Sequence, residues 1–122
     1  MARDRTGVPQ VNLPLTGWTV RLHDAHLVVD PGGSPLTHHV LAQPILGAHH
    51  VRLARPFGPA AVDTVTVAYG TASGPVVLAR HRPWRPARLD EIRPVILADR
   101  IWVVEQPGRY DEVRAGDAVR LL

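Results

Sequence analysis

Prolines and glycines interrupt this chain so often that they limit what it can fold into. The 122 residues include 12 prolines and 10 glycines, and no long stretch is free of them. A long uninterrupted helix is therefore hard to place. The segments between the breakers are short, rich in Val, Ile, Leu and Thr, and recur about every ten residues, which is typical of all-β domains. We predict a single-domain antiparallel β-barrel or β-sandwich of about 7–9 short strands.

The strands are predicted from runs of β-branched and aromatic residues between turn signals. In residues 61–69, Val65, Val67 and Tyr69 fall on one face while Thr64 and Thr66 fall on the other, which predicts a half-buried strand. We expect at most one or two short helices, capped at Ser34 or Asp90. The predicted strands are Trp18–Leu22, His26–Val29, Thr37–Ala42, His49–Ala54, Val62–Tyr69, Val76–Arg80, Val95–Leu97, Ile101–Glu105 and Ala118–Leu122.

The length favours one compact domain. We divide the chain into an extended N-terminal segment, residues 1–16, and a single β-domain, residues 17–122. No apolar run approaches the roughly 20 residues that a membrane-spanning helix needs. The first residues also lack the apolar core of a signal peptide. We therefore expect a cytoplasmic protein without a membrane partner.

Several common catalytic groups are missing. The chain has no cysteine and no lysine, and it contains 14 arginines. Thiolate chemistry, disulfides, Schiff bases and a Walker A lysine are thereby excluded. The only serines, Ser34 and Ser73, do not lie in a G-x-S-x-G motif. We expect no cofactor and no metal, and we leave open whether the protein is an enzyme.

Two pairs of adjacent histidines, His38-His39 and His49-His50, are the first candidate site. If their segments form a hairpin centred on Pro44, His38 lies opposite His50 and His39 opposite His49. Cross-strand Cβ atoms are then about 4.5–5.5 Å apart, which suits acid–base chemistry or a shared ion.

A metal site in this hairpin would still need a third ligand from elsewhere in the chain. The candidates for that ligand are His23, Asp24, His26 and Asp63. The ordinary alternative is that one histidine of each pair packs against the core while the other is solvated, and we favour it.

The second candidate site is the arginine-rich segment of residues 80–90. Its proposed binding residues are Arg80, Arg82, Trp84, Arg85 and Arg88. Prolines on both sides of Trp84 favour an extended backbone. Arginine and tryptophan are typical anchors of protein interfaces, and they also bind anionic ligands or nucleic acids. In a purely structural role, Trp84 would close the end of a barrel while the arginines pair with acids.

Two functions remain open at this point. The first is a non-catalytic interaction or assembly module, acting as a subunit of a larger assembly or as a homo-oligomer. Its partner is a protein or a second copy, with an anionic ligand or nucleic acid as the alternative. The second is a small cofactor-free β-barrel enzyme, a cyclase, isomerase or lyase, with histidines as acid and base in an internal cavity. We favour the first, because no complete set of catalytic groups can be assembled.

Overall fold

The computed structural model describes residues 2–3, 8–40 and 43–122. Their backbone forms thirteen strands, and no helix occurs among them. The described residues therefore include no helix long and apolar enough to cross a membrane. The strands are β1 (Ala2–Arg3), β2 (Pro9–Asn12), β3 (Thr19–His23), β4 (His26–Asp30), β5 (Leu36–His39), β6 (Gly47–Phe57), β7 (Val62–Gly70), β8 (Val76–Arg82), β9 (Arg85–Ile92), β10 (Val95–Leu97), β11 (Ile101–Pro107), β12 (Glu112–Ala115) and β13 (Ala118–Leu121).

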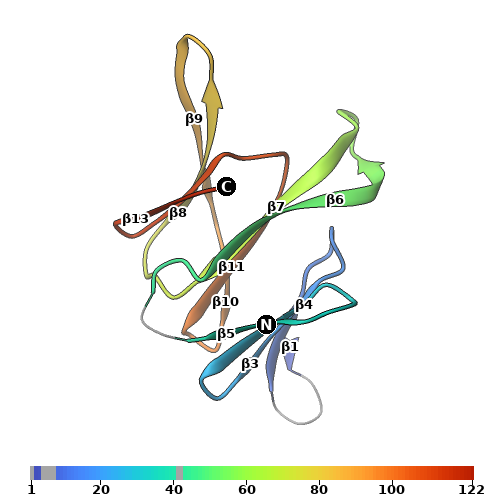
Figure 1. The fold of residues 1–122 in the computed structure, drawn as a ribbon, viewed down its shortest axis with the longest axis vertical. Helices are drawn as coiled ribbons and strands as arrows, with labels where there is room; N and C mark the ends of the chain where they lie inside the picture. The colour runs from blue at the N-terminus through green and yellow to red at the C-terminus, as the bar shows by residue number, and fades with distance from the viewer. Residues whose placement is uncertain (1, 4–7, 41–42) are drawn as a thin grey trace.

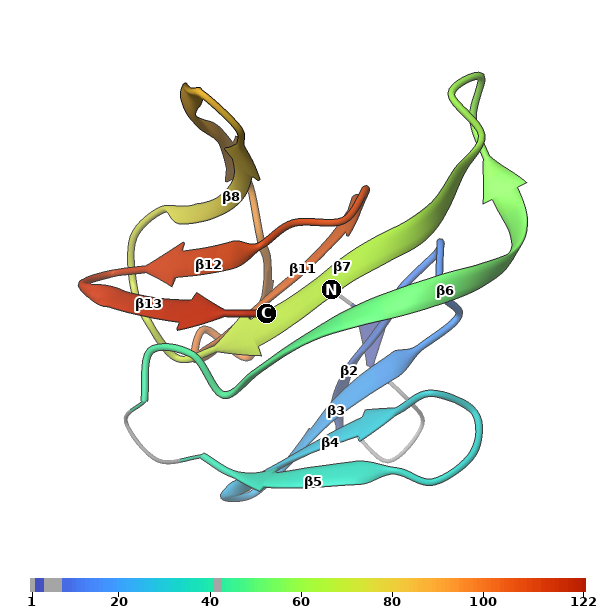
Figure 2. The ribbon, with the colours of Figure 1, turned by 45° about the horizontal axis from the view of Figure 1, so that its top comes forward.

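These strands form three antiparallel sheets (Figures 1 and 2). Sheet A has the order β1-β2-β3-β4-β5, sheet B the order β10-β11-β7-β6, and sheet C the order β13-β12-β8-β9. The prediction of an all-β antiparallel protein is confirmed. In the part of the chain that is described, no sheet closes into a barrel. The strands also exceed the predicted number, because several segments assigned to loops are paired.

The two short helices allowed by the sequence are not formed. Asp90, a predicted cap, lies inside β9, and its neighbours pair with β8. Ser34 and Pro35 lead directly into β5, which pairs with β4. In both places cross-strand hydrogen bonding satisfies the backbone groups that a short helix would leave unpaired at its ends.

Sheet B lies between two hydrophobic cores. Successive side chains of a strand point to opposite faces, and both faces of this sheet are buried. One core contains β7 residues Val65, Val67 and Tyr69 and residues of sheet A such as Leu27. The other contains Ala68, Trp102 and Val104 from sheet B and residues of sheet C, among them Val76, Leu78, Val113 and Ala115.

The central strand β7 is more deeply buried than its alternation suggested. Residues 65–70 are all buried, including Thr66. The polar face of this strand was predicted to be solvated. Instead the Thr66 hydroxyl donates to the Gly108 carbonyl at 2.9 Å and accepts from the Tyr110 N–H at 3.2 Å. Trp102 lies on the opposite face of β11 from Ile101 and Val103, because it belongs to the other core.

Part of the N-terminal segment belongs to sheet A. Residues 9–12 form β2 and pair with β3, and the following Leu13 is buried in the core. The carboxylate of Glu105 in β11 accepts hydrogen bonds from the N–H groups of Leu15 and Thr16 at 2.9 and 2.8 Å. This contact fastens the β2–β3 loop of sheet A to sheet B.

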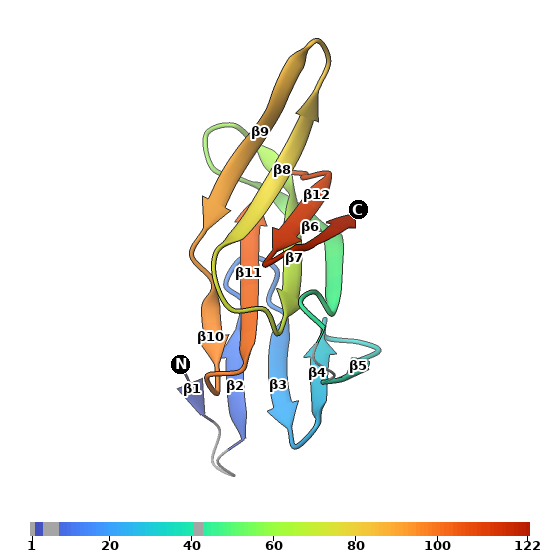
Figure 3. The same cartoon turned by 90° about the vertical axis from the view of Figure 1, so that its left-hand side faces the viewer.

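The β8–β9 hairpin extends beyond sheet C (Figures 1 and 3). Its base, residues 76–79, pairs with β12, whereas residues 80–88 continue past the end of that strand. We call residues 80–88 the arm. The sequence predicted an extended backbone here without a partner strand, and the structure pairs Arg80 with Arg88 and Arg82 with Arg85.

Candidate functional site

The structure separates the two histidine pairs into different sheets. His38 and His39 lie in β5, which pairs with β4 of sheet A. His49 and His50 lie in β6, which pairs with β7 of sheet B. The predicted hairpin is therefore wrong. Pro44 is not the tip of a turn, because its carbonyl accepts hydrogen bonds from Trp102 Nε1 at 2.9 Å and from the backbone of Thr71 at 3.1 Å. Residues 41–42 of the predicted strand lie outside the described residues.

One histidine from each pair nevertheless reaches the same atom. The hydroxyl oxygen of Tyr69 lies 2.9 Å from His38 Nε2 and 2.7 Å from His49 Nε2. A hydroxyl has a single proton to donate, so at least one imidazole must donate its own N–H to the tyrosine. Gly47 makes this arrangement fit, because it pairs with Tyr69 in the sheet and a Cβ there would lie 2.5 Å from the hydroxyl. We call His38, His49 and Tyr69 the tyrosine–histidine cluster.

The surroundings of the cluster favour uncharged side chains. Burial lowers the pKa of His38 and of His49, and Arg120 lowers both further. His38 itself also lowers the pKa of His49. Burial raises the pKa of Tyr69 to about 12, against a smaller opposing effect of Arg120. The cluster is thus a neutral hydrogen-bonded network across sheets A and B, with the Arg120 guanidinium near it.

The other two histidines of the pairs have different surroundings. His50 Nε2 lies 2.6 Å from the backbone carbonyl of Tyr110 and must donate to it. His39 lies beside His26 of β4, with ring centroids 4.5 Å apart. The four predicted catalytic residues therefore do not share one site.

The candidates for a third metal ligand are also dispersed. Asp63 lies 4.0 Å from Arg52 at the far end of β7, and Asp24 occupies the β3–β4 turn. Among the residues that the structure describes, no group of three or more histidine, aspartate or glutamate side chains is arranged to hold a metal ion.

An open groove of about 670 Å³ is lined in part by a residue that contacts the cluster. Trp18, whose ring centroid lies 5.7 Å from that of His49, forms part of its wall. Leu15, Leu53 and Phe57 line other parts. Tyr69 has no exposed surface, so its hydroxyl is not available to a molecule in the groove.

The arginines of the second candidate site divide into those with partners and one without. The Arg80 guanidinium lies 4.9 Å above the ring of Tyr110. Arg82 donates to the Pro86 carbonyl at 2.9 and 3.1 Å, and Arg88 lies 3.3 Å from Asp90. Arg85 makes no hydrogen bond or ion pair with any described residue. Arg80 thus belongs to the base of the arm, and Arg85 is its unpaired cation.

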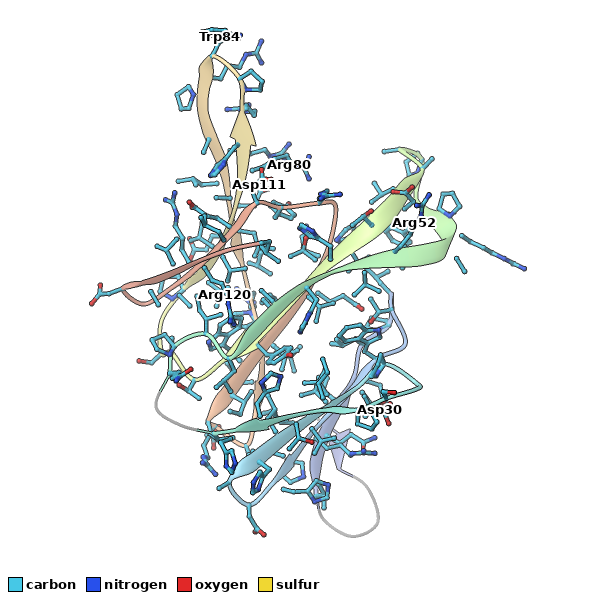
Figure 4. All side chains as sticks on the ribbon, viewed as in Figure 1. Asp30, Arg52, Arg80, Trp84, Asp111 and Arg120 are labelled. Carbon is cyan, nitrogen blue, oxygen red and sulfur yellow. The ribbon has the colours of Figure 1, made fainter. Side chains whose placement is uncertain are left out.

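Trp84 stands at the tip of the arm, fully exposed (Figure 4). Pro83 and Trp84 form a two-residue turn between Arg82 and Arg85. Trp84 has a φ of +61°, a left-handed conformation that costs about 1–2 kcal/mol for a residue with a Cβ. Glycine is the usual residue at such a position. The barrel plug of the purely structural alternative is therefore not observed, and the aromatic side chain of a strained residue points into solvent.

The backbone of the arm is anchored at its base. The N–H of His81 donates to the Asp111 carboxylate at 2.7 Å, and the N–H of Asp111 donates to the Ala79 carbonyl at 2.8 Å. Figure 4 shows Arg80 and Asp111 close to where the arm leaves sheet C. These contacts hold the hairpin on the sheet and leave its tip free.

Sequence reasoning did not identify Tyr69, Tyr110 or Arg120 as site residues. Tyr69 was assigned to a core face, which is correct, but no local signal indicates that its hydroxyl meets two histidines from distant segments. No protein-family model, curated protein or solved structure matches the chain. Functional inference therefore depends on the geometry of the cluster and the arm.

Proposed function

We propose that the protein is a non-catalytic interaction or assembly module that binds a partner protein through the arm. The observation that carries this proposal is the fully exposed Trp84 at the tip of a two-residue turn. Its φ of +61° makes tryptophan an unfavourable residue for that turn. The fold gains no contact from it, so a contact outside the chain is the simplest reason for its presence.

The chemistry of the arm indicates what kind of surface it fits. An indole buries a large apolar area and is a frequent energetic anchor in protein interfaces. Arg82, Arg85 and Arg88 give the same hairpin a positive charge, only partly offset by Asp90. A protein surface with an apolar pocket rimmed by acidic side chains matches both properties. Nucleic acid is the competing partner for such a basic segment.

Exposed edge strands give the assembly role a second line of support. β9 and β13 are the two edges of sheet C. Leu89 on β9 is 53% exposed, and Leu121 on β13 is 70% exposed. Edge strands with apolar side chains are prone to pair with another chain. Self-association through sheet C is therefore part of the proposal, and a second copy is one of the partners to be tested.

The enzyme alternative ranks second. The tyrosine–histidine cluster contains the groups that acid–base catalysis uses. However, a substrate would have to reach a tyrosine hydroxyl with no exposed surface, and His50 is occupied by a backbone carbonyl. The contacts of the cluster are better explained by joining two sheets.

The proposal is tested by comparing the wild-type chain with Trp84→Ala and Arg85→Ala variants. Phe57→Ala is the matched control, because Phe57 is an exposed aromatic residue on β6, away from the arm. Each tagged chain is expressed in its source cells, and bound protein and nucleic acid are quantified after nuclease treatment. Native mass spectrometry gives the number of copies in each complex.

We expect a defined protein complex that persists after nuclease treatment and in the Phe57→Ala chain. In the Trp84→Ala chain, the fraction of chains bound to the partner should fall by at least about 90%, as for an interface anchor. A complex unaffected by both arm substitutions would overturn the proposal. Loss on nuclease treatment would replace the protein partner with nucleic acid.

A further inference from the structure

Three of the seven histidines stand in a row across sheet A. His23 of β3 pairs with His26 of β4, and His26 pairs with His39 of β5. Directly paired residues of neighbouring strands project from the same face of a sheet. The three strands that carry them lie side by side in Figure 2. The row is on the outer face, because Leu22, Leu27 and His38, next to these residues in sequence, point to the core side.

Among the described residues, the imidazoles of this row differ from those of the other four histidines in having no hydrogen-bond or ion-pair partner. His38 and His49 bind Tyr69, His50 binds a carbonyl, and His81 lies 3.5 Å from Glu112. Within the described part of the chain, the side chains of His23, His26 and His39 make no hydrogen bond or ion pair. Their nitrogen atoms are thus not committed elsewhere, and two of the rings are in contact.

The separation of the His26 and His39 ring centroids fits coordination of one ion by both imidazoles. Bonds of about 2.0–2.1 Å from an ion to imidazole nitrogens place each ring centre about 3.2 Å from the ion. Two rings at about 90° around that ion would have centres about 4.5 Å apart, whereas a tetrahedral angle would need about 5.2 Å. The observed separation is 4.5 Å. Right-angle coordination is the preference of Cu²⁺ and Ni²⁺.

The electrostatic surroundings allow a cation to approach. Arg21 lies on this face, two residues from His23, and its guanidinium is 3.8 Å from Asp30, whose carboxylate offsets its charge. Arg100 donates to the Asp24 carbonyl in the β3–β4 turn at 3.4 Å. Val28 and Thr37 lie in the same cross-strand row as Arg21, next to the row of histidines. Water is free to supply the remaining ligands, because His39 and His23 are both exposed.

We propose that His26 and His39 form a two-imidazole site for a divalent ion of tetragonal preference, Cu²⁺ or Ni²⁺, on the outer face of sheet A. His23, on the other side of His26, is outside the site, because the three side chains are not arranged to hold one ion together. The sequence led us to expect no metal, because two histidines alone are an incomplete site, and it paired His39 with His49 instead of His26. The pairing of β4 with β5 is what brings the two rings together.

The experiment titrates the metal-free full chain with Cu²⁺, Ni²⁺ and Zn²⁺, each alone, by calorimetry. The Cu²⁺ form is also examined by electron paramagnetic resonance for coupling to two imidazole nitrogens. The variants are His26→Gln and His39→Gln, with His23→Gln and His81→Gln as matched controls. Urea midpoints of all variants verify that each chain is folded.

We expect one ion per chain, with Cu²⁺ and Ni²⁺ bound more tightly than Zn²⁺. Either substitution in the pair should weaken binding at least about tenfold, and the double variant should be little weaker than each single one, because one ligand alone loses the benefit of chelation. The controls should change affinity less than about threefold. Equal affinity in the wild type and in folded His26→Gln and His39→Gln chains would overturn the proposal, as would an equal loss in His81→Gln. Neither result bears on the arm.

Discussion

The Nε2 atom of His38 lies 2.9 Å from the hydroxyl oxygen of Tyr69, and this hydrogen bond joins sheet A to sheet B. His49 approaches the same oxygen from within sheet B at 2.7 Å. A buried hydroxyl that left these bonds unmade would lose stabilisation. A polar contact within the hydrophobic core therefore helps to hold the two sheets together.

Replacing Tyr69 by Phe should lower the free energy of unfolding by about 1–2 kcal/mol, because both imidazoles lose their partner while the ring is kept. Urea denaturation measures this change. Tyr69→Phe in a His38→Ala, His49→Ala background provides the control, in which the loss should be smaller. A change below about 0.3 kcal/mol in the wild-type background would show that the hydroxyl contributes nothing to stability.

The cluster also predicts which histidines are energetically coupled. His38→Ala and His49→Ala should be non-additive in a double-mutant cycle, because both act through one hydroxyl. His39→Ala and His49→Ala should be additive, since these residues lie in different sheets without a shared partner. The hairpin predicted from the sequence would instead make His39 and His49 the coupled residues. Urea midpoints of the five variants and the wild type decide between the two arrangements.

Stability should fall as the solution is acidified from pH 8 to pH 5.5. Burial lowers the pKa of His38 and His49 in the folded chain, while the unfolded chain takes up protons near a pKa of about 6.5. The unfolded state then binds more protons, so the stabilisation is complete above the unfolded pKa and declines as pH falls toward the folded values. Denaturation at each pH measures this decline. The His38→Ala, His49→Ala double variant should show a shallower slope, and an unchanged slope would contradict the assignment.

Replacing Trp84 by Gly should stabilise the isolated protein by about 1 kcal/mol, because glycine adopts the observed φ of +61° without strain. Thermal and urea denaturation measure the gain. Trp84→Ala is the control, since alanine has the same Cβ penalty and should leave stability nearly unchanged. A destabilised Trp84→Gly chain would mean that the indole supports the fold.

Replacing Gly47 by Ala should destabilise the chain by about 2–3 kcal/mol, the upper part of the range for overpacking in a core. The added Cβ would lie 2.5 Å from the Tyr69 hydroxyl and 2.6 Å from its Cζ atom. Gly33→Ala is the matched control, because nothing lies within 4 Å of a Cβ at that position. Similar unfolding midpoints for the two variants would show that Tyr69 can shift without cost.

The sequence predicted the features that depend on neighbouring residues and missed those that depend on residues far apart in the chain. Alternation along residues 61–69 correctly placed Val65, Val67 and Tyr69 on one face, because the period of a strand is a local property. The choice of pairing partner is not local. The two histidine segments resemble each other, yet β5 pairs back with β4 and β6 pairs forward with β7. No local pattern shows that the backbone around Pro44 is held by Trp102, 58 residues further along.

The same distinction applies to the sites. The arm was found from its composition, because arginine and tryptophan between prolines form a continuous stretch. Its hairpin geometry was not found, since each proline constrains its neighbour without specifying a partner strand. The tyrosine–histidine cluster and the His26–His39 pair arise only when separate strands come together, so neither has a signature within one segment.

The continuity of the arm with sheet C has a mechanical consequence. A pull on the tip enters along the axis of β8, whose residues 76–79 pair with β12. Hydrogen bonds in an antiparallel pair run perpendicular to the strands. A load along β8 would therefore strain all of them at the same time, instead of breaking them one after another. The core between sheets B and C lies directly behind this pair. A partner attached at Trp84 would thus transmit tension into the strand pair that covers the core between sheets B and C.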